Sequence, residues 1–261
     1  MTGLIRIELF KLRTTRMAYG LLGVAAGLTV LFSNLEASRA GTGRAVAPLY
    51  TSSGLTSVIT GGTWALLLAA VLGVTISSGE FRHQTATTTY LASPDRNRVL
   101  AAKAVAGALA GAVFGLTGYV IAAGTGLIYT AVHHYHLAAS DGTLARYGIG
   151  HILAAALLAA IGVALGSLVR SQIAGVIGVF VWAIIIESLI GGLFNSVWRY
   201  LPYTAATTLA GSAIGGAAFG PAHGINGGGP LPFAGAAGLL AGLAAVLAFI
   251  AARTTVRRDI T

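Results

Sequence analysis

Few side chains in this 261-residue sequence could bind a polar ligand or take part in a reaction. Glu187 is the only acidic residue inside a long apolar stretch, where an ionisable group is costly and therefore suggests function. We expect Glu187 to bind a cationic substrate or to stabilise a gate; the alternative is a protonated or hydrogen-bonded carboxyl with a structural role. His133, His134 and His136 flank Tyr135 and could hold zinc or copper, but no carboxylate or thiolate completes a ligand set. We therefore predict no metal site.

The sequence offers no arrangement of residues typical of an enzyme. It has no cysteine, and its apolar stretches contain no paired acids, Ser–His set or metal cluster of the kind that a membrane-embedded enzyme would need. Its two lysines, Lys11 and Lys103, follow no glycine-rich loop that could cradle phosphates, and the motif G-x-x-x-x-G-K-[ST] does not occur. We expect no cofactor in this chain and no ATP hydrolysis by this polypeptide alone.

The composition is that of a membrane protein. Hydrophobic residues make up 56% of the chain and charged residues 9%, whereas soluble domains carry about 25% charged residues. The net charge of +9 is distributed in short clusters between apolar runs, so it indicates contact with lipid headgroups and not with nucleic acid. The apolar runs recur from end to end, which predicts a single membrane domain over residues 1–261.

Six apolar segments are long enough to cross the bilayer as helices, because a hydrocarbon core of about 30 Å requires roughly 20 helical residues. These predicted spans cover residues 17–35, 58–77, 100–130, 149–169, 173–194 and 233–252. If the N-terminus lies inside the cell, twelve of the 16 Lys and Arg residues fall in cytoplasmic parts and four outside. We therefore expect an all-α protein of a bacterial cell membrane, with both termini in the cytoplasm.

Glycines recur at four-residue spacing in several of these segments. Such spacing places them on one helix face, where helices can approach closely in a membrane. The pairs and series concerned are Gly23 with Gly27, Gly107 with Gly111 and Gly115, Gly162 with Gly166, and Gly238 with Gly242. We expect these faces to pack within one chain; the alternative is that one of them forms a subunit interface.

The loop at residues 77–103 is the most polar part of the sequence and falls on the predicted cytoplasmic side. Ser93 and Pro94 have the character of an N-cap and a first helical residue, with Asp95 in the first turn, so we expect span 3 to begin in the cytoplasm. Residues 80–91 could form a short helix on the membrane surface. A solvated connector is the alternative.

The first sixteen residues mix apolar and basic positions. Ile5, Leu9 and Leu12 form one helical stripe, which predicts an interfacial helix on the inner leaflet. A simple positively charged flank is the alternative. The basic residues expected to meet anionic headgroups are Arg6, Lys11, Arg13 and Arg16.

Three stretches resemble the permease subunits of ABC-2 type ATP-binding cassette exporters, particularly those of high-GC Gram-positive bacteria. They are ELFKLRTTR at 8–16, SSGEFRHQTATTTYLASPDRNRVLAAK at 77–103 and IIESLIGGLFNSVWRYLPYTAATTL at 185–209. The length and the six-span topology agree, so the similarity covers essentially the whole chain. The motifs are degenerate, and the middle loop is the most specific.

The resemblance implies a half-transporter that pairs with itself or with a similar chain and binds two copies of a separate ATPase subunit, which holds ATP and Mg. It implies export of an amphipathic or hydrophobic compound, and short re-entrant helices at the outer face between spans 5 and 6. The residues that would couple the chain to the ATPase are Glu80, Phe81, Arg82, His83 and Thr85. An ion- or proton-coupled carrier is the alternative function, although a single intramembrane glutamate and no evident inverted repeat argue against it.

Overall fold

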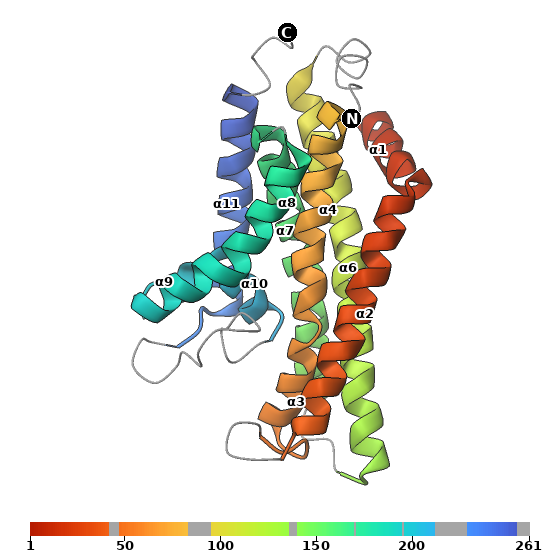
Figure 1. Ribbon diagram of the computed structural model, residues 1–261, viewed down its shortest axis with the longest axis vertical. Coiled ribbons are helices and arrows are strands. Elements are labelled where there is room, and N and C mark those ends of the chain that lie inside the picture. The colour runs from red at the N-terminus through yellow and green to blue at the C-terminus, as the bar shows by residue number, and fades with distance from the viewer. Residues whose placement is uncertain are drawn as a thin grey trace.

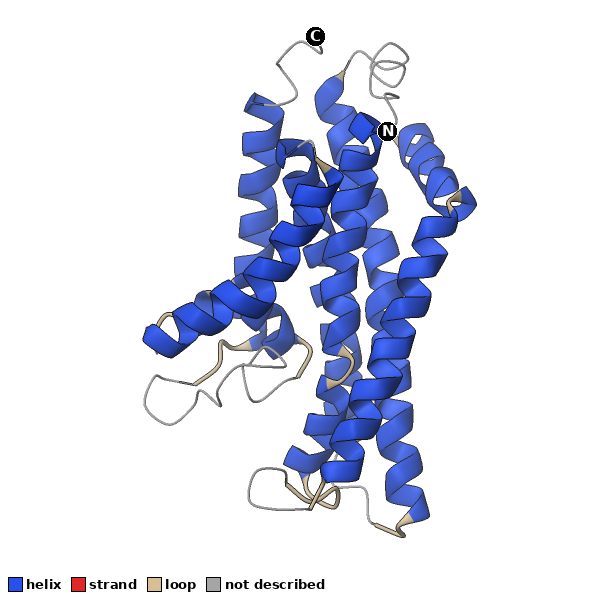
Figure 2. Cartoon of the chain, viewed as in Figure 1, coloured by secondary structure: helices blue, strands red, loops and turns tan. Residues whose placement is uncertain are grey.

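The computed structural model describes residues 1–41, 47–82, 95–135, 140–169, 171–194, 196–211 and 229–254. In these ranges the chain forms helices and connecting turns, with no strand (Figure 2). The helices are α1 (Thr2–Thr14), α2 (Arg16–Arg39), α3 (Ser52–Thr60), α4 (Thr63–Arg82), α6 (Arg96–Val132), α7 (Asp141–Val169), α8 (Gln172–Phe180), the π-helix η1 (Val181–Ile186), α9 (Glu187–Leu193), the 3-10 helix η2 (Trp198–Tyr200), α10 (Pro202–Leu209) and α11 (Phe233–Thr254).

Six helical stretches within the described residues are long and apolar enough to cross a membrane, as the sequence predicted. They comprise α2, α3 with α4, α6, α7, α8 with η1 and α9, and α11. Figure 1 shows them side by side as a bundle, with α1 and the last turn of α11 at the same end. At five of the twelve predicted bounds the helix extends four to eight residues further, because hydropathy marks the apolar centre of a helix and not its polar ends.

The centre of the bundle is the contact between α4 and α7. Gly73 of α4 and Gly162 and Gly166 of α7 let the two backbones approach closely: a Cβ added at Gly162 would meet the Ala70 carbonyl group and lie 3.0 Å from the Val74 nitrogen. Gly107, Gly111 and Gly115 of α6 face α7 in the same way. These series therefore pack within the chain, as expected for helices in lipid.

The other glycine pairs point away from the protein. A Cβ added at Gly23, Gly27, Gly238 or Gly242 would meet no other atom within 4 Å. The prediction of packing within one chain is thus confirmed for the glycines of α6 and α7 and is wrong for those of α2 and α11. Equal spacing in the sequence does not reveal which face of a helix meets its neighbours.

Gly162→Ala should lower the free energy of unfolding by about 1–3 kcal/mol, because the added methyl group overpacks a backbone contact. Gly238→Ala is the matched control and should leave stability unchanged or slightly increase it, since alanine favours a helix and has open space at this position. Unfolding of the detergent-solubilised protein in denaturant measures both. Equal stability of the two variants would contradict the packing described for Gly162.

Span 2 is interrupted, which the sequence analysis did not predict. Gly61 and Gly62 form a turn between α3 and α4. A Cβ at Gly61 would collide with Ser33 of α2, and a Cβ at Gly62 would lie 2.9 Å from His151 Nε2. Only glycine fits at this crossing, so the two residues place a helix break inside the bundle, where protein covers the backbone.

The start of α6 also differs from the prediction. Asp95 is the N-cap, with a carboxylate oxygen that accepts the Arg98 backbone N–H at 3.2 Å, so the helix begins after Asp95 and not at Pro94. Aspartate is as good an N-cap as serine, and here its side chain makes the capping bond. Ser93 and most of residues 80–91 lie outside the described residues.

Candidate functional site

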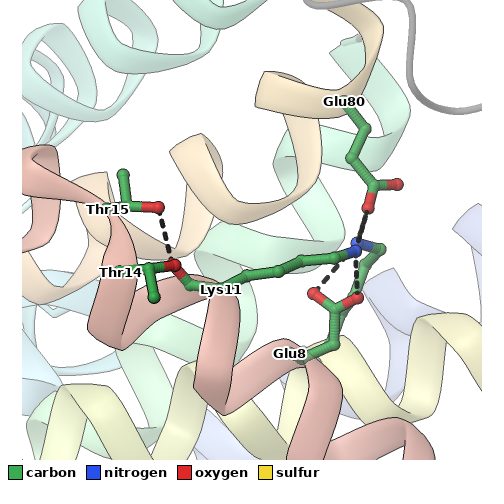
Figure 3. A network of polar contacts seen from close by, with 6 residues as sticks. Glu8, Lys11, Thr14, Thr15 and Glu80 are labelled. Carbon is green, nitrogen blue, oxygen red and sulfur yellow. Dashed lines mark hydrogen bonds and ion pairs between the residues drawn. The ribbon is translucent and has the colours of Figure 1, made fainter.

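A cluster of four charged side chains joins α1, α4 and α6 at one end of the bundle (Figure 3). Lys103 Nζ lies 2.6 Å from Glu80 Oε1 and 3.2 Å from Glu8 Oε2. Lys11 Nζ lies 2.8 Å from Glu8 Oε1 and 3.0 Å from Glu80 Oε1. Each ammonium group therefore contacts both carboxylates, and the two positive charges offset the two negative ones. We call these four residues the ionic cluster.

Three members of the ionic cluster are shielded from solvent. The exposed fraction of the side chain is 4% for Lys103, 8% for Glu8 and 12% for Glu80, against 45% for Lys11. A buried charge is tolerated only when it is paired and hydrogen-bonded, so each side chain depends on the others. Burial by itself lowers the pKa of Lys11, but hydrogen bonds and charge from Glu8 and Glu80 outweigh burial and raise that pKa above its usual value. Lys11 therefore remains charged at neutral pH.

The ionic cluster fixes the N-terminal helix to both sides of the polar loop. Glu80 lies in the last turn of α4, just before residues 83–94, and Lys103 lies in the second turn of α6, just after them. Glu8 and Lys11 come from α1. Movement of the loop ends must therefore move α1 with them, or break buried ion pairs.

Part of the predicted coupling segment falls within the ionic cluster. Glu80 belongs to the ionic cluster. Phe81 and Arg82 are the last two residues of α4, and their side chains are not described. His83 and Thr85 lie outside the described residues. The stripe of Ile5, Leu9 and Leu12 lies on helix α1 and is half-buried, so the predicted helix is confirmed, whereas its position on the inner leaflet stays a prediction.

Of the basic residues predicted for the interfacial helix, Arg6, Arg13 and Arg16 are exposed, whereas Lys11 turns to the ionic cluster. The outward face of α1 also carries Phe10 and Ile7, which are 66% and 54% exposed. An exposed mixture of arginine and large apolar side chains suits the boundary between headgroups and acyl chains.

Sequence analysis missed Glu8 and Lys103 as site residues. Their positions are 95 residues apart, so no local pattern could pair them. One signal was present: the sequence has only two lysines among its 16 basic residues, and both belong to the ionic cluster. Lysine carries a compact ammonium group with three donors, so each of the two can contact both carboxylates.

The second polar centre is Glu187, which is 3% exposed. Its carboxylate accepts hydrogen bonds from the backbone N–H groups of Tyr203 and Thr204 at 2.7 and 2.8 Å, from the Thr204 hydroxyl at 2.9 Å and from Trp182 Nε1 at 2.9 Å. The two N–H groups belong to the first turn of α10, whose donors have no partner within the helix. Glu187 therefore caps α10 with a charge that suits the positive end of that helix.

The π-helix η1 explains how Trp182 reaches Glu187. The two residues are five apart, and in an α-helix they would lie on different faces. A π-helix repeats its contacts from i to i+5, so η1 brings both side chains to the same side. This accounts for a tryptophan in the middle of a span.

The contacts of Glu187 favour the structural alternative left open by the sequence. Both carboxylate oxygens already accept hydrogen bonds from the protein. Binding of a cationic substrate, or a role in a gate, stays a prediction. Either would require α10 or Trp182 to move.

A partly open groove of about 360 Å³ lies beside this centre. Its walls come from α4, α7, α8, η1 and α11, and the first residues of α10 complete the lining. The lining is apolar except for the indole of Trp182 and the phenol of Tyr203.

The histidines predicted near Tyr135 and a further histidine, His151, differ in their surroundings. The His133 ring stacks between Tyr129 and Tyr135 at centroid distances of 6.0 and 5.6 Å, and His136 lies outside the described residues. Within the described part of the chain, no three His, Asp or Glu residues come together as metal ligands. His151 is fully buried: Nδ1 bonds the Tyr147 carbonyl at 3.0 Å, and Nε2 has no hydrogen-bond partner.

Comparison with known proteins adds no family assignment: neither the family models nor the curated proteins gave a match to this chain.

Proposed function

We propose that this chain is the permease subunit of an ATP-driven exporter, coupled through its 77–103 loop to a separate ATPase subunit. The observation that carries the proposal is the ionic cluster, which links α1 to both ends of this loop. The exported compound is amphipathic or hydrophobic, and the working unit is a dimer of this chain, or of this chain with a similar one, bound to two ATPase subunits. Its place is the cell membrane.

The mechanism follows from the connection of the three helices. A permease without a nucleotide site must receive work through its cytoplasmic surface. An ATPase that moves the loop would also move α1, α4 and α6, because the ionic cluster joins them. Since α4 packs along α7 at the centre of the bundle, this displacement reaches the spans and shifts the balance between inward-facing and outward-facing states.

The double substitution Glu80→Gln/Lys103→Met tests the coupling. It removes one positive and one negative charge and leaves the Glu8–Lys11 pair. In a complex with an ATPase subunit that copurifies with this chain, we expect ATP hydrolysis to fall several-fold while the complex still assembles. The comparison is Asp95→Asn/Arg98→Met, which removes an exposed ion pair of the same loop and retains a capping side chain, so it separates loss of the buried ion pairs from loss of any ion pair in this loop. Normal hydrolysis by the first variant would refute the coupling role.

Sidedness has its own test. The chain has no cysteine, so single cysteines can be introduced at Gly3 of α1 and Gly142 of α7, both exposed and open. In intact cells, an impermeant maleimide should label Gly142→Cys, whereas Gly3→Cys should react only after the membrane is permeabilised. The reverse pattern would overturn the proposed orientation.

An ion- or proton-coupled carrier is the second candidate, favoured by one observation. The break between α3 and α4 lies against the buried, unpartnered Nε2 of His151, and interrupted helices beside ionisable groups occur in such carriers. If this function is correct, purified protein alone should transport in response to a proton gradient, and His151→Gln should abolish the response.

A further inference from the structure

We infer that the groove between α7, α8 and α11 binds one acyl chain of a membrane phospholipid. One wall of the groove follows α7 from Leu158 to Val169, and another returns along α8 and η1 from Ala174 to Ala183. At about 1.5 Å per residue, the α7 wall is about 16 Å long. That is about half of a hydrocarbon core of about 30 Å, the depth of one leaflet.

The direction of the groove agrees with a chain that enters from a headgroup. Val169 and Ala174 lie on either side of the turn between α7 and α8, at the end of the bundle that also carries α1 (Figure 1). Pro202 and Tyr203, at the start of α10, also line the groove. With the proposed sidedness, the groove therefore runs from the level of the inner headgroups toward the middle of the bilayer.

The chemistry of the lining excludes a polar ligand. Only two lining side chains carry polar atoms, and both are used: Trp182 Nε1 donates to Glu187 at 2.9 Å, and the Tyr203 hydroxyl donates to the Thr63 carbonyl at 3.1 Å. A headgroup or a charged substrate would lose its own hydrogen bonds here without replacement. An alkyl chain loses none, and it restores the dispersion contacts that an unfilled groove lacks.

The width of the groove favours an acyl chain over a helix from a second copy of this protein. A helix with its side chains is about 10–12 Å across. A volume of about 360 Å³ spread over the length of the α7 wall is narrow by comparison. A second copy could cover the mouth of the groove but could not fill it.

Trp182 reports occupancy directly. It is 42% exposed, whereas Trp64 is 9% and Trp198 2% exposed. A phosphatidylcholine with one dibrominated acyl chain should therefore quench mainly Trp182 when added to the purified full chain in detergent micelles. We expect quenching to saturate at low lipid mole fraction, and Trp182→Phe to remove the saturable part.

Gly178 provides the groove-filling variant. It lines the groove, and a Cβ added there meets no atom within 4 Å. Gly178→Phe should raise the lipid fraction needed for half-quenching at least three-fold, and Gly178→Leu serves if the larger residue prevents folding. Gly242→Phe, on an equally open face of α11 outside the groove, should retain wild-type quenching.

Two results would overturn the inference. Identical, non-saturating curves for the wild type, Gly178→Phe and Gly242→Phe would mean that Trp182 meets only bulk lipid. Quenching that appears only after dilution to monomers would mean that a second copy covers the groove. The assay needs no ATPase and no transport, so its outcome is independent of the proposed function.

Discussion

Replacing Lys103 with methionine is expected to lower the free energy of unfolding by about 3–5 kcal/mol, the loss that follows removal of one partner from a buried ion pair. Lys103 is the most buried member of the ionic cluster and contacts both carboxylates. Without it, Glu8 and Glu80 remain shielded from solvent, and the half-exposed Lys11 is the one lysine of the ionic cluster left to contact them. Unfolding in denaturant, followed by tryptophan fluorescence in detergent micelles, measures the change.

Lys11→Met is the matched comparison. Its side chain is 45% exposed, so water can replace much of its interaction, and we expect a loss of about 1 kcal/mol or less. Glu8→Gln/Lys103→Met should be more stable than Lys103→Met alone, because the second substitution also removes the negative charge of Glu8, one of the two carboxylates that lose Lys103. If the two lysine variants are equally stable, the ionic cluster does not hold the three helices together.

Glu187→Ala should be comparably damaging. It leaves four donors without an acceptor, namely the N–H groups of Tyr203 and Thr204, the Thr204 hydroxyl and the Trp182 indole. A buried donor without a partner costs about 1–3 kcal/mol, so the expected loss is several kcal/mol. Thermal unfolding of the purified protein measures it. Detachment of α10 should also expose Tyr203 and Thr204, which hydrogen exchange at their backbone amides would detect.

Graded substitutions separate the cap from a transport role. Trp182→Phe removes a single donor and should cost about 1 kcal/mol. Glu187→Gln should fall between Trp182→Phe and Glu187→Ala, because an amide retains one acceptor oxygen but turns an NH₂ group toward other donors. If the Glu187→Ala protein is as stable as the wild type but no longer transports, then Glu187 binds substrate or stabilises a gate and has no structural role.

The sequence predicted the six helices because each needs about 20 apolar residues, a requirement that apolar run lengths record directly. It did not predict the break at Gly61 and Gly62, because both residues are compatible with an apolar run and the reason for the break is the proximity of Ser33 and His151. Those neighbours come from α2 and α7. Their approach is a property of packing, not of local sequence.

The candidate site was predictable only in part. Glu187 was recognised from its unusual setting, but its partners at Tyr203 and Thr204 lie 16 and 17 residues away. The Trp182–Glu187 spacing of five residues was a usable sign of a π-helix. Glu8, Glu80 and Lys103 could not be grouped beforehand, because their contact depends on how α1 folds back on the bundle.

Site-directed cross-linking to the ATPase tests the central claim most directly. Single cysteines at Gly3, on the α1 end, and at Gly142, on the opposite end, are compared in a complex with an ATPase subunit that copurifies with this chain. A short thiol-to-amine cross-linker should join Gly3→Cys to the ATPase and leave Gly142→Cys unlinked. If neither position is linked, or only Gly142→Cys is, the α1 end is not where an ATPase binds, and the coupling account is wrong.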